Sequence, residues 1–118
     1  MYKLLLAALM FLACQPSITG GCSNTVIAES KSPDGQYSAT FFERDCGATT
    51  DYSSLISLRE SNKDFDTEDV EIVVAIDGRS DIQMQWTSRR SLWIDPGDSE
   101  VVRHNGRWRD VQVSVKEQ

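Results

Sequence analysis

The sequence predicts an all-β domain, built as a single small antiparallel sandwich or partly open barrel of seven or eight short strands with one disulfide. Short segments alternate apolar and polar residues, as strands with one buried face do. Turn-forming pairs such as Asp77-Gly78 and Asn105-Gly106 separate these segments at hairpin spacing. No stretch repeats its apolar residues with the 3.6-residue period of a helix.

The expected strands lie between these turns. The alternation is clearest around Ile82, Met84 and Trp86, which share one face of their segment. The polar, acidic segment 61–69 is expected to be a long surface loop. The segments expected to form strands are 25–29, 36–44, 52–59, 70–76, 81–87, 91–94, 100–103 and 110–116.

Length and charge limit the classes of function. A chain of 118 residues holds one domain and a leader. The formal net charge of −6 makes nucleic acid an improbable partner, because an acidic surface repels phosphate backbones. It also disfavours adsorption to anionic lipid, so contact with a membrane is expected only through a covalent anchor.

Residues 1–13 are expected to be a signal peptide. The apolar run that follows Lys3 has about ten residues, whereas a membrane-spanning helix needs about twenty. The segment 11–14 resembles the cleavage site of bacterial lipoproteins, which implies that Cys14 carries lipid, although Phe11 stands where that pattern prefers Leu. Gln15 then resembles the pattern that sorts lipoproteins to the outer membrane.

Two cleavage outcomes therefore stay open. In the first, the protein is an outer-membrane-anchored lipoprotein that faces the periplasm, with a flexible tether over 14–23 and a β domain over 24–118. In the second, a general signal peptidase cuts between Ala13 and Gly21 and releases a soluble periplasmic or secreted protein. A second lipoprotein-like site ends at Cys22 but lies well beyond the apolar run.

The cysteine count points to a structural disulfide. Three cysteines in an exported chain leave one over. If Cys14 carries lipid, an oxidising compartment would join Cys22 to Cys46. That bridge closes a loop of about 25 residues and would stabilise the domain by about 3.5 kcal/mol. A redox role would need a CxxC pair or a cationic setting, and acidic neighbours offset the charge of Arg44.

One long segment carries a resemblance. Residues 32–60, SPDGQYSATFFERDCGATTDYSSLISLRE, are similar to a group of uncharacterised bacterial exported proteins and lipoproteins. These proteins follow an SPDG-x-Y strand with the segment that reads RDCGATT at 44–50. Residues 84–94 and 108–115 also resemble that group. The resemblance implies export and pairing of Cys22 with Cys46, and it implies no activity.

No catalytic residue, cofactor or metal site is expected from the motifs. The chain has no GxSxG, no phosphate-binding glycine loop and no local nucleophile–base pair. His104 is the only histidine and is expected to be solvated at a hairpin tip. The EF-hand spacing fails because Asp69 and Ala75 hold the sixth and twelfth positions from Asp64. A weak, irregular Ca²⁺ site stays open among Asp64, Asp66, Glu68, Asp69 and Glu71.

The tryptophans give a candidate partner surface. Trp86 follows the apolar residues of its strand, whereas Trp93 and Trp108 fall opposite the apolar residues of theirs. They either pack a second layer, turn inward at a bulge, or contact a partner, since tryptophan is enriched at binding hot spots. Nearby arginines extend this candidate surface, which would be excluded if both tryptophans were fully buried: Arg89, Arg90, Arg107 and Arg109.

Three functions are expected in order of support. The first is a non-catalytic envelope lipoprotein or periplasmic module that binds a protein or envelope component. The second is a small secreted inhibitor of an envelope-attacking hydrolase such as a lysozyme, with loop 46–51 as its plug. The third is a hydrolase with an unrecognised site.

Overall fold

The structure is a computed structural model that describes residues 21–47 and 52–117. These residues form strands and turns without a helix, which confirms the expected all-β class. None of them forms a helix long and apolar enough to cross a membrane. The strands are β1 (Ser23–Lys31), β2 (Tyr37–Asp45), β3 (Ser53–Glu60), β4 (Glu71–Asp77), β5 (Gln83–Ser88), β6 (Ser91–Asp95), β7 (Val101–His104), β8 (Arg107–Trp108) and β9 (Val111–Val115).

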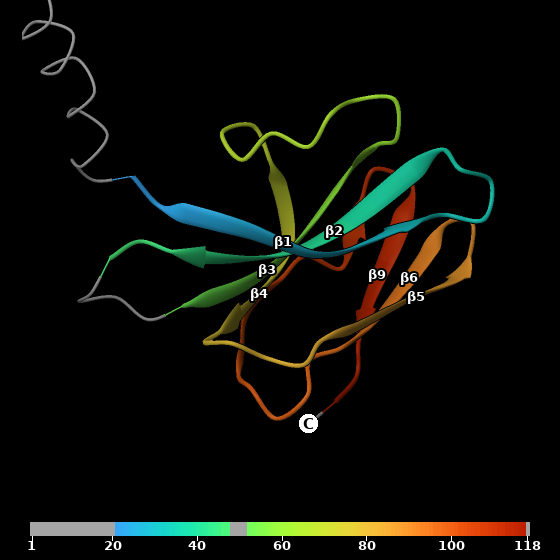
Figure 1. The fold of residues 1–118 in the computed structure, drawn as a ribbon. Coiled ribbons are helices and arrows are strands. Elements are labelled where there is room, and N and C mark those ends of the chain that lie inside the picture. Colours follow the sequence, from blue (N-terminus) through green and yellow to red (C-terminus); the bar gives the residue numbers. More distant parts are fainter. Residues whose placement is uncertain (1–20, 48–51, 118) are drawn as a thin grey trace, which may run out of the picture.

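The strands form two sheets, in the orders β1-β2-β3-β4-β7 and β5-β6-β9-β8 (Figure 1). The consecutive pairs β1–β2, β2–β3, β3–β4, β5–β6 and β8–β9 are antiparallel, as expected from the hairpin-length turns. The pair β6–β9 is parallel, which the expected antiparallel arrangement did not include. After β6 the chain crosses to the other sheet as β7 before it returns, and such a crossover lets two strands of one sheet run in the same direction.

The hydrophobic core lies between the two sheets. Alternate residues of each strand point into it, so the period-two patterns of the sequence supply it directly. Met84 and Trp86 of β5, and Ile82 directly before it, are half-buried against this core, in agreement with their expected shared face. The fully packed members are Tyr37, Ala39, Phe41, Ile56, Leu58, Val73, Val74, Ile76, Leu92, Ile94, Trp108, Val111 and Val113.

The five-stranded sheet also buries its outer face. Phe42 and Leu55 point away from the main core, yet they are only 0% and 5% exposed. The β3–β4 loop arches over this face (Figure 1), and its Phe65 ring lies 5.1 Å from the ring of Phe42. Arg59 fixes the loop by donating from Nε to the carbonyl oxygen of Lys63 at 2.8 Å. The acidic loop is therefore a partial third layer as well as a surface segment.

The disulfide joins Cys22 to Cys46 and confirms the expected pairing. Cys22 directly precedes β1 and Cys46 directly follows β2. Because Ser23 pairs with Asp45 at the end of the antiparallel ladder, the two cysteines form the next pair outward, with 4.0 Å between their Cα atoms. The bridge thus closes the open end of the β1–β2 hairpin.

Candidate functional site

Trp108 belongs to the core, which removes it from the predicted partner surface. It is 8% exposed, and its ring meets the Tyr37 ring edge-on at 5.1 Å between centroids. Its indole N–H donates to Glu71 Oε2 at 2.9 Å. The chain reverses at Arg109, whose φ is +53°, so Trp108 pairs across the ladder with Val111 and shares its face. Alternation counted along the sequence from Val111 back to Trp108 ignores this turn, and it therefore placed Trp108 on the wrong face of the sheet.

Arg109 is also committed to the fold. Its guanidinium lies 4.5 Å from the centre of the Trp108 ring, on which it stacks. Its Nη1 donates to Glu60 Oε1 at 2.8 Å, and this hydrogen bond, with the charge of Lys63, lowers the pKa of Glu60. The residue therefore covers a core tryptophan and binds a carboxylate of β3, instead of offering a free cation to a partner.

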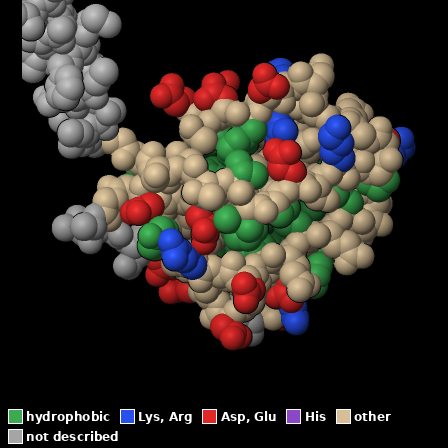
Figure 2. All heavy atoms as spheres, in the orientation of Figure 1, with side chains coloured by type: hydrophobic (Ala, Val, Ile, Leu, Met, Phe, Trp, Pro, Cys, Tyr) green, Lys and Arg blue, Asp and Glu red, His purple; other side chains and the backbone are tan. Residues whose placement is uncertain are grey.

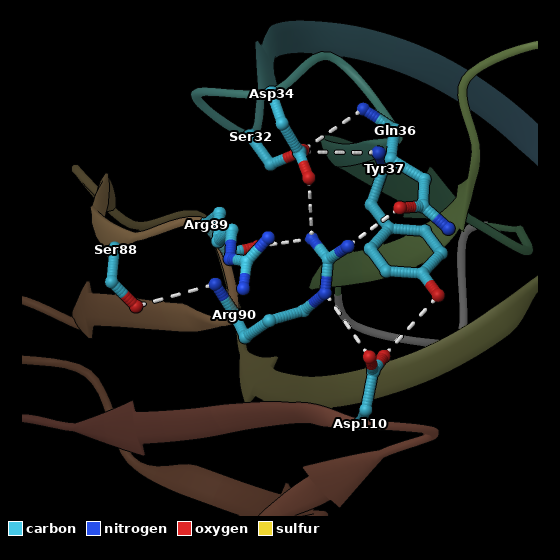
Figure 3. A network of polar contacts seen from close by, with 8 residues as sticks. All are labelled: Ser32, Asp34, Gln36, Tyr37, Ser88, Arg89, Arg90 and Asp110. Atoms are coloured by element: carbon cyan, nitrogen blue, oxygen red, sulfur yellow. Dashed lines mark hydrogen bonds and ion pairs between the residues drawn. The ribbon is translucent and has the colours of Figure 1, made fainter.

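Arg90 joins three turns that are distant in sequence (Figure 3). From the β5–β6 turn, its Nη1 lies 3.0 Å from Asp34 Oδ2 and its Nε lies 3.1 Å from Asp110 Oδ2. Its guanidinium also lies 4.9 Å from the centre of the Tyr37 ring, and the Tyr37 hydroxyl donates to Asp110 at 3.2 Å. The β1–β2, β5–β6 and β8–β9 turns are thereby held together at one end of the two sheets.

Asp34 accepts two local hydrogen bonds in addition to its ion pair with Arg90. The Ser32 hydroxyl donates to its Oδ1 at 2.8 Å, and the backbone N–H of Gln36 donates to the same oxygen at 3.1 Å. These two hydrogen bonds, together with the charge of Arg90, lower the pKa of Asp34 below its usual 3.8. A lowered pKa in the folded state means that ionised Asp34 stabilises the fold above about pH 4. That contribution is lost as the pH falls through the lowered value.

We therefore expect Asp34→Asn to lower the thermal midpoint most at neutral pH. The difference from the wild type should shrink as the pH falls below about 4, where Asp34 becomes protonated in the unfolded wild type, and should vanish at lower pH, where the folded carboxylate is protonated too. Thermal denaturation followed by circular dichroism between pH 2 and 7 measures this convergence. Asp98→Asn is the control, since Asp98 is exposed and makes no ion pair to the described residues. A difference that stays constant with pH would show that the Asp34 charge does not stabilise the fold.

Trp93 remains on the outer face of the four-stranded sheet. Its neighbours Leu92 and Ile94 point into the core and are 1% and 0% exposed, so Trp93 points outward, where it is half-buried. It lies between Gln85 of β5 and Ser114 of β9, its partners in the two ladders. We call this surface the Trp93 face, formed by Gln83, Gln85, Ser91, Trp93, Asp95, Arg107, Gln112 and Ser114.

Hydrogen bonding separates Trp93 from the other two tryptophans. The indole N–H of Trp86 donates to the Ser30 carbonyl oxygen at 3.0 Å, and that of Trp108 donates to Glu71. Among residues 21–47 and 52–117, the Trp93 indole N–H has no partner. The same holds for the side chains of Gln83, Gln85, Arg107, Gln112 and Ser114. Their hydrogen-bonding groups are thus free to meet solvent or a ligand.

The Trp93 face differs in charge from the rest of the molecule. Its only carboxylate, Asp95, lies 3.7 Å from Lys116 Nζ and is neutralised there. Arg107 is on the same face, opposite Gln112, and is exposed. Elsewhere acidic side chains are scattered over the surface, as the view in Figure 2 shows, and the whole chain carries −6. The face is therefore locally neutral to positive on an acidic protein.

Arg89, the last member of the predicted partner surface, is exposed in the β5–β6 turn. Its backbone carbonyl accepts a hydrogen bond from Arg90 Nη1 at 2.6 Å, and its own guanidinium makes no ion pair to a described residue. Of the six residues predicted from sequence, the structure therefore places Trp93 and Arg107 on the same face of the four-stranded sheet, leaves Arg89 at a neighbouring turn, and uses three in the fold. The amides of the face were not predicted, although their alternation with apolar residues identifies them.

Apart from the Trp93 face, a hollow of about 390 Å³ lies beneath the β3–β4 loop. Ser57 lines it, and its buried Oγ has no hydrogen-bond partner among the described residues. Charges at its rim already pair with one another, as Glu60 does with Lys63 and Arg109. In the part of the chain that the structure describes, no group of His, Cys, Asp or Glu side chains gathers to hold a metal ion. The acidic residues lining this hollow, which include most of the candidate Ca²⁺ ligands, are Glu60, Asp64, Asp66, Asp69 and Glu71.

Several residues singled out from the sequence lie outside the described residues, and His104 lies on the surface. Lipidation at Cys14 and most of the 14–23 tether lie outside them, as do four residues of the predicted inhibitory plug, 48–51. His104 is exposed at the end of β7, and its Nε2 lies 2.9 Å from the Val113 carbonyl oxygen, so this ring nitrogen donates there.

Comparison with known proteins adds no relative. No protein-family model matches the chain, and no curated protein or solved structure matches it either. The similarity of residues 32–60 to exported bacterial proteins stays a prediction from the sequence.

Proposed function

We propose that this protein is a non-catalytic binding module of the bacterial cell envelope. A lipidated Cys14 would hold it at the outer membrane, and the Trp93 face would contact its partner. The observation that carries this proposal is the outward tryptophan at the centre of a rigid sheet, with an indole N–H that no described residue satisfies.

The energetics of binding favour this face. Tryptophan is the residue type most enriched at hot spots, because it buries a large apolar area and can also donate a hydrogen bond. A side chain on a central strand is held in place by its neighbours, so little conformational entropy is lost when a partner binds. Trp93 meets both conditions, because β6 has β5 on one side and β9 on the other.

The disulfide supports the expected location. Exported proteins form and keep disulfides, whereas cytosolic thiols are usually reduced. The Cys22–Cys46 bridge closes the end of the β1–β2 ladder. This agrees with export by the leader at residues 1–13, which is a prediction from the sequence.

Capture from an envelope extract with the oxidised mature domain tests the proposal. Trp93→Ala should weaken capture of the main partner by about thirtyfold, the equivalent of a hot-spot loss of about 2 kcal/mol. The matched control is Val102→Ala, because Val102 is 61% exposed on β7 of the other sheet. Equal capture by the wild type and Trp93→Ala would contradict the proposal, as would a loss confined to Val102→Ala.

A further inference from the structure

We infer that the ligand of the Trp93 face is the glycan strand of peptidoglycan, a polymer of N-acetylated amino sugars. This inference rests on the proposed function and names the partner class for the same surface. It follows from the shape of the face, from the chemistry of its side chains and from its charge.

The arrangement around Trp93 fits a sugar ring. A pyranose presents a flat C–H surface that buries well on an aromatic ring, with hydroxyl and acetamido groups around its edge. Gln85 and Ser114 are on the strands next to Trp93, each about 5 Å away across the sheet. A ring stacked on the indole would therefore place its edge groups over an amide on one side and a hydroxyl on the other.

The polar side chains of the face have the donors and acceptors that such a ligand needs. An amide side chain offers two N–H donors and one carbonyl acceptor, so it can pair with an acetamido group or with neighbouring hydroxyls. Gln83, Gln85 and Gln112 make no side-chain hydrogen bond to a described residue. Because Gln83 and Gln85 lie on β5 and Gln112 lies on β9, on the two sides of β6, they could contact more than one sugar of an extended chain.

The same composition disfavours a protein partner. The buried centre of a protein–protein interface is more apolar than the rest of the protein surface. The Trp93 face has one aromatic residue and no aliphatic one. Within 21–47 and 52–117, the large aliphatic side chains that are exposed are on β1 and β7 of the other sheet: Val26, Ile27 and Val102. A surface of amides, hydroxyls and a single indole is better suited to a hydroxylated polymer.

Charge complementarity selects among polysaccharides. Asp95 is paired with Lys116, whereas Arg107 makes no ion pair to a described residue. The sugars of peptidoglycan are uncharged, and carboxylates hang from them at intervals. Arg107 can bind one such carboxylate while Trp93 stacks on a ring. A densely anionic polymer would instead be repelled by the surrounding acidic surface, since the chain carries −6.

Co-sedimentation with purified sacculi, stripped of bound protein, tests the inference. The oxidised mature domain should sediment with sacculi, and Trp93→Ala should raise the dissociation constant at least tenfold. Gln85→Ala should raise it severalfold, whereas Val102→Ala on the other sheet should not change it. Titration with a soluble N-acetylglucosamine oligosaccharide should quench tryptophan fluorescence, and a matched glucose oligosaccharide without acetamido groups should bind more weakly.

The outcomes separate this inference from the proposed function. A wild-type domain that stays in the supernatant, or a Trp93→Ala domain that sediments like the wild type, overturns the glycan assignment. If capture from envelope extract still depends on Trp93 in that case, the partner is a protein and the proposed function stands. If neither sacculi nor extract distinguishes Trp93→Ala from the wild type, both are wrong.

Discussion

Replacing Trp108 with alanine should lower the free energy of unfolding by about 3–5 kcal/mol, the usual cost of truncating a buried tryptophan. The substitution removes the edge-on contact with Tyr37 and leaves a cavity beside Val111. It also removes the surface on which Arg109 stacks and the donor to Glu71. Urea unfolding monitored by circular dichroism measures the loss.

Trp93→Ala is the matched control for this prediction, since it makes the same change on the outer face of the four-stranded sheet. It should cost about 1 kcal/mol or less, because Trp93 is half-buried and makes no contact with the main core. If both variants lose the same stability, the two tryptophans do not have the different roles assigned to them. A small loss for Trp108→Ala would return Trp108 to the predicted partner surface.

Removing the disulfide should have the next largest effect. The double substitution of Cys22→Ala and Cys46→Ala opens the loop between these two positions, which are 24 residues apart in sequence. On the loop-entropy model this lowers the free energy of unfolding by about 3.5 kcal/mol. Urea midpoints of the oxidised wild type and of the double variant measure the difference, and the wild type in reducing buffer should match the variant.

The loss should be felt first in β1. This strand is an edge of the five-stranded sheet, and most of its side chains are exposed, so its ladder with β2 is the main interaction that holds it. Native-state hydrogen exchange should show its amides exchanging faster in the double variant, while those of the central strand β3 change less. Unchanged midpoints and unchanged exchange in β1 would mean that the bridge does not support the hairpin.

The strands could be predicted because their local pattern and their burial agree. All eight segments expected from alternation and turns are strands in the structure, and Ile82, Met84 and Trp86 face the core as expected. The two-residue strand β8 was missed, since two residues are too few to show a period. The cysteine count likewise predicted the disulfide without any geometry.

Three features required the tertiary structure. The face of Trp108 depends on the left-handed backbone of Arg109, a non-glycine residue for which the sequence gives no warning. The parallel pairing of β6 with β9 depends on where the chain returns after crossing sheets. The ion pairs of Arg90 with Asp34 and Asp110 join turns that only the fold brings together.

Only part of the candidate site could be predicted, because alternation along one strand says nothing about the neighbouring strands. Trp93 stood out because its parity opposes Leu92 and Ile94 within one strand, where alternation is reliable. Arg107 was named for its nearness to Trp108 in sequence, but it shares a face with Trp93, two strands away across β9. Contacts between strands that are separated in sequence cannot be obtained from alternation along one strand.

Site-specific photo-cross-linking in growing bacteria tests the central claim most directly. A benzophenone side chain replaces Gln85 or Ser114 beside Trp93, and in the matched control it replaces Val102 on the other sheet. We expect both positions on the Trp93 face to give the same adduct, attached to sacculi, and position 102 to give none. Adducts from position 102 alone, or none from either position beside Trp93, would contradict the role of this face in binding.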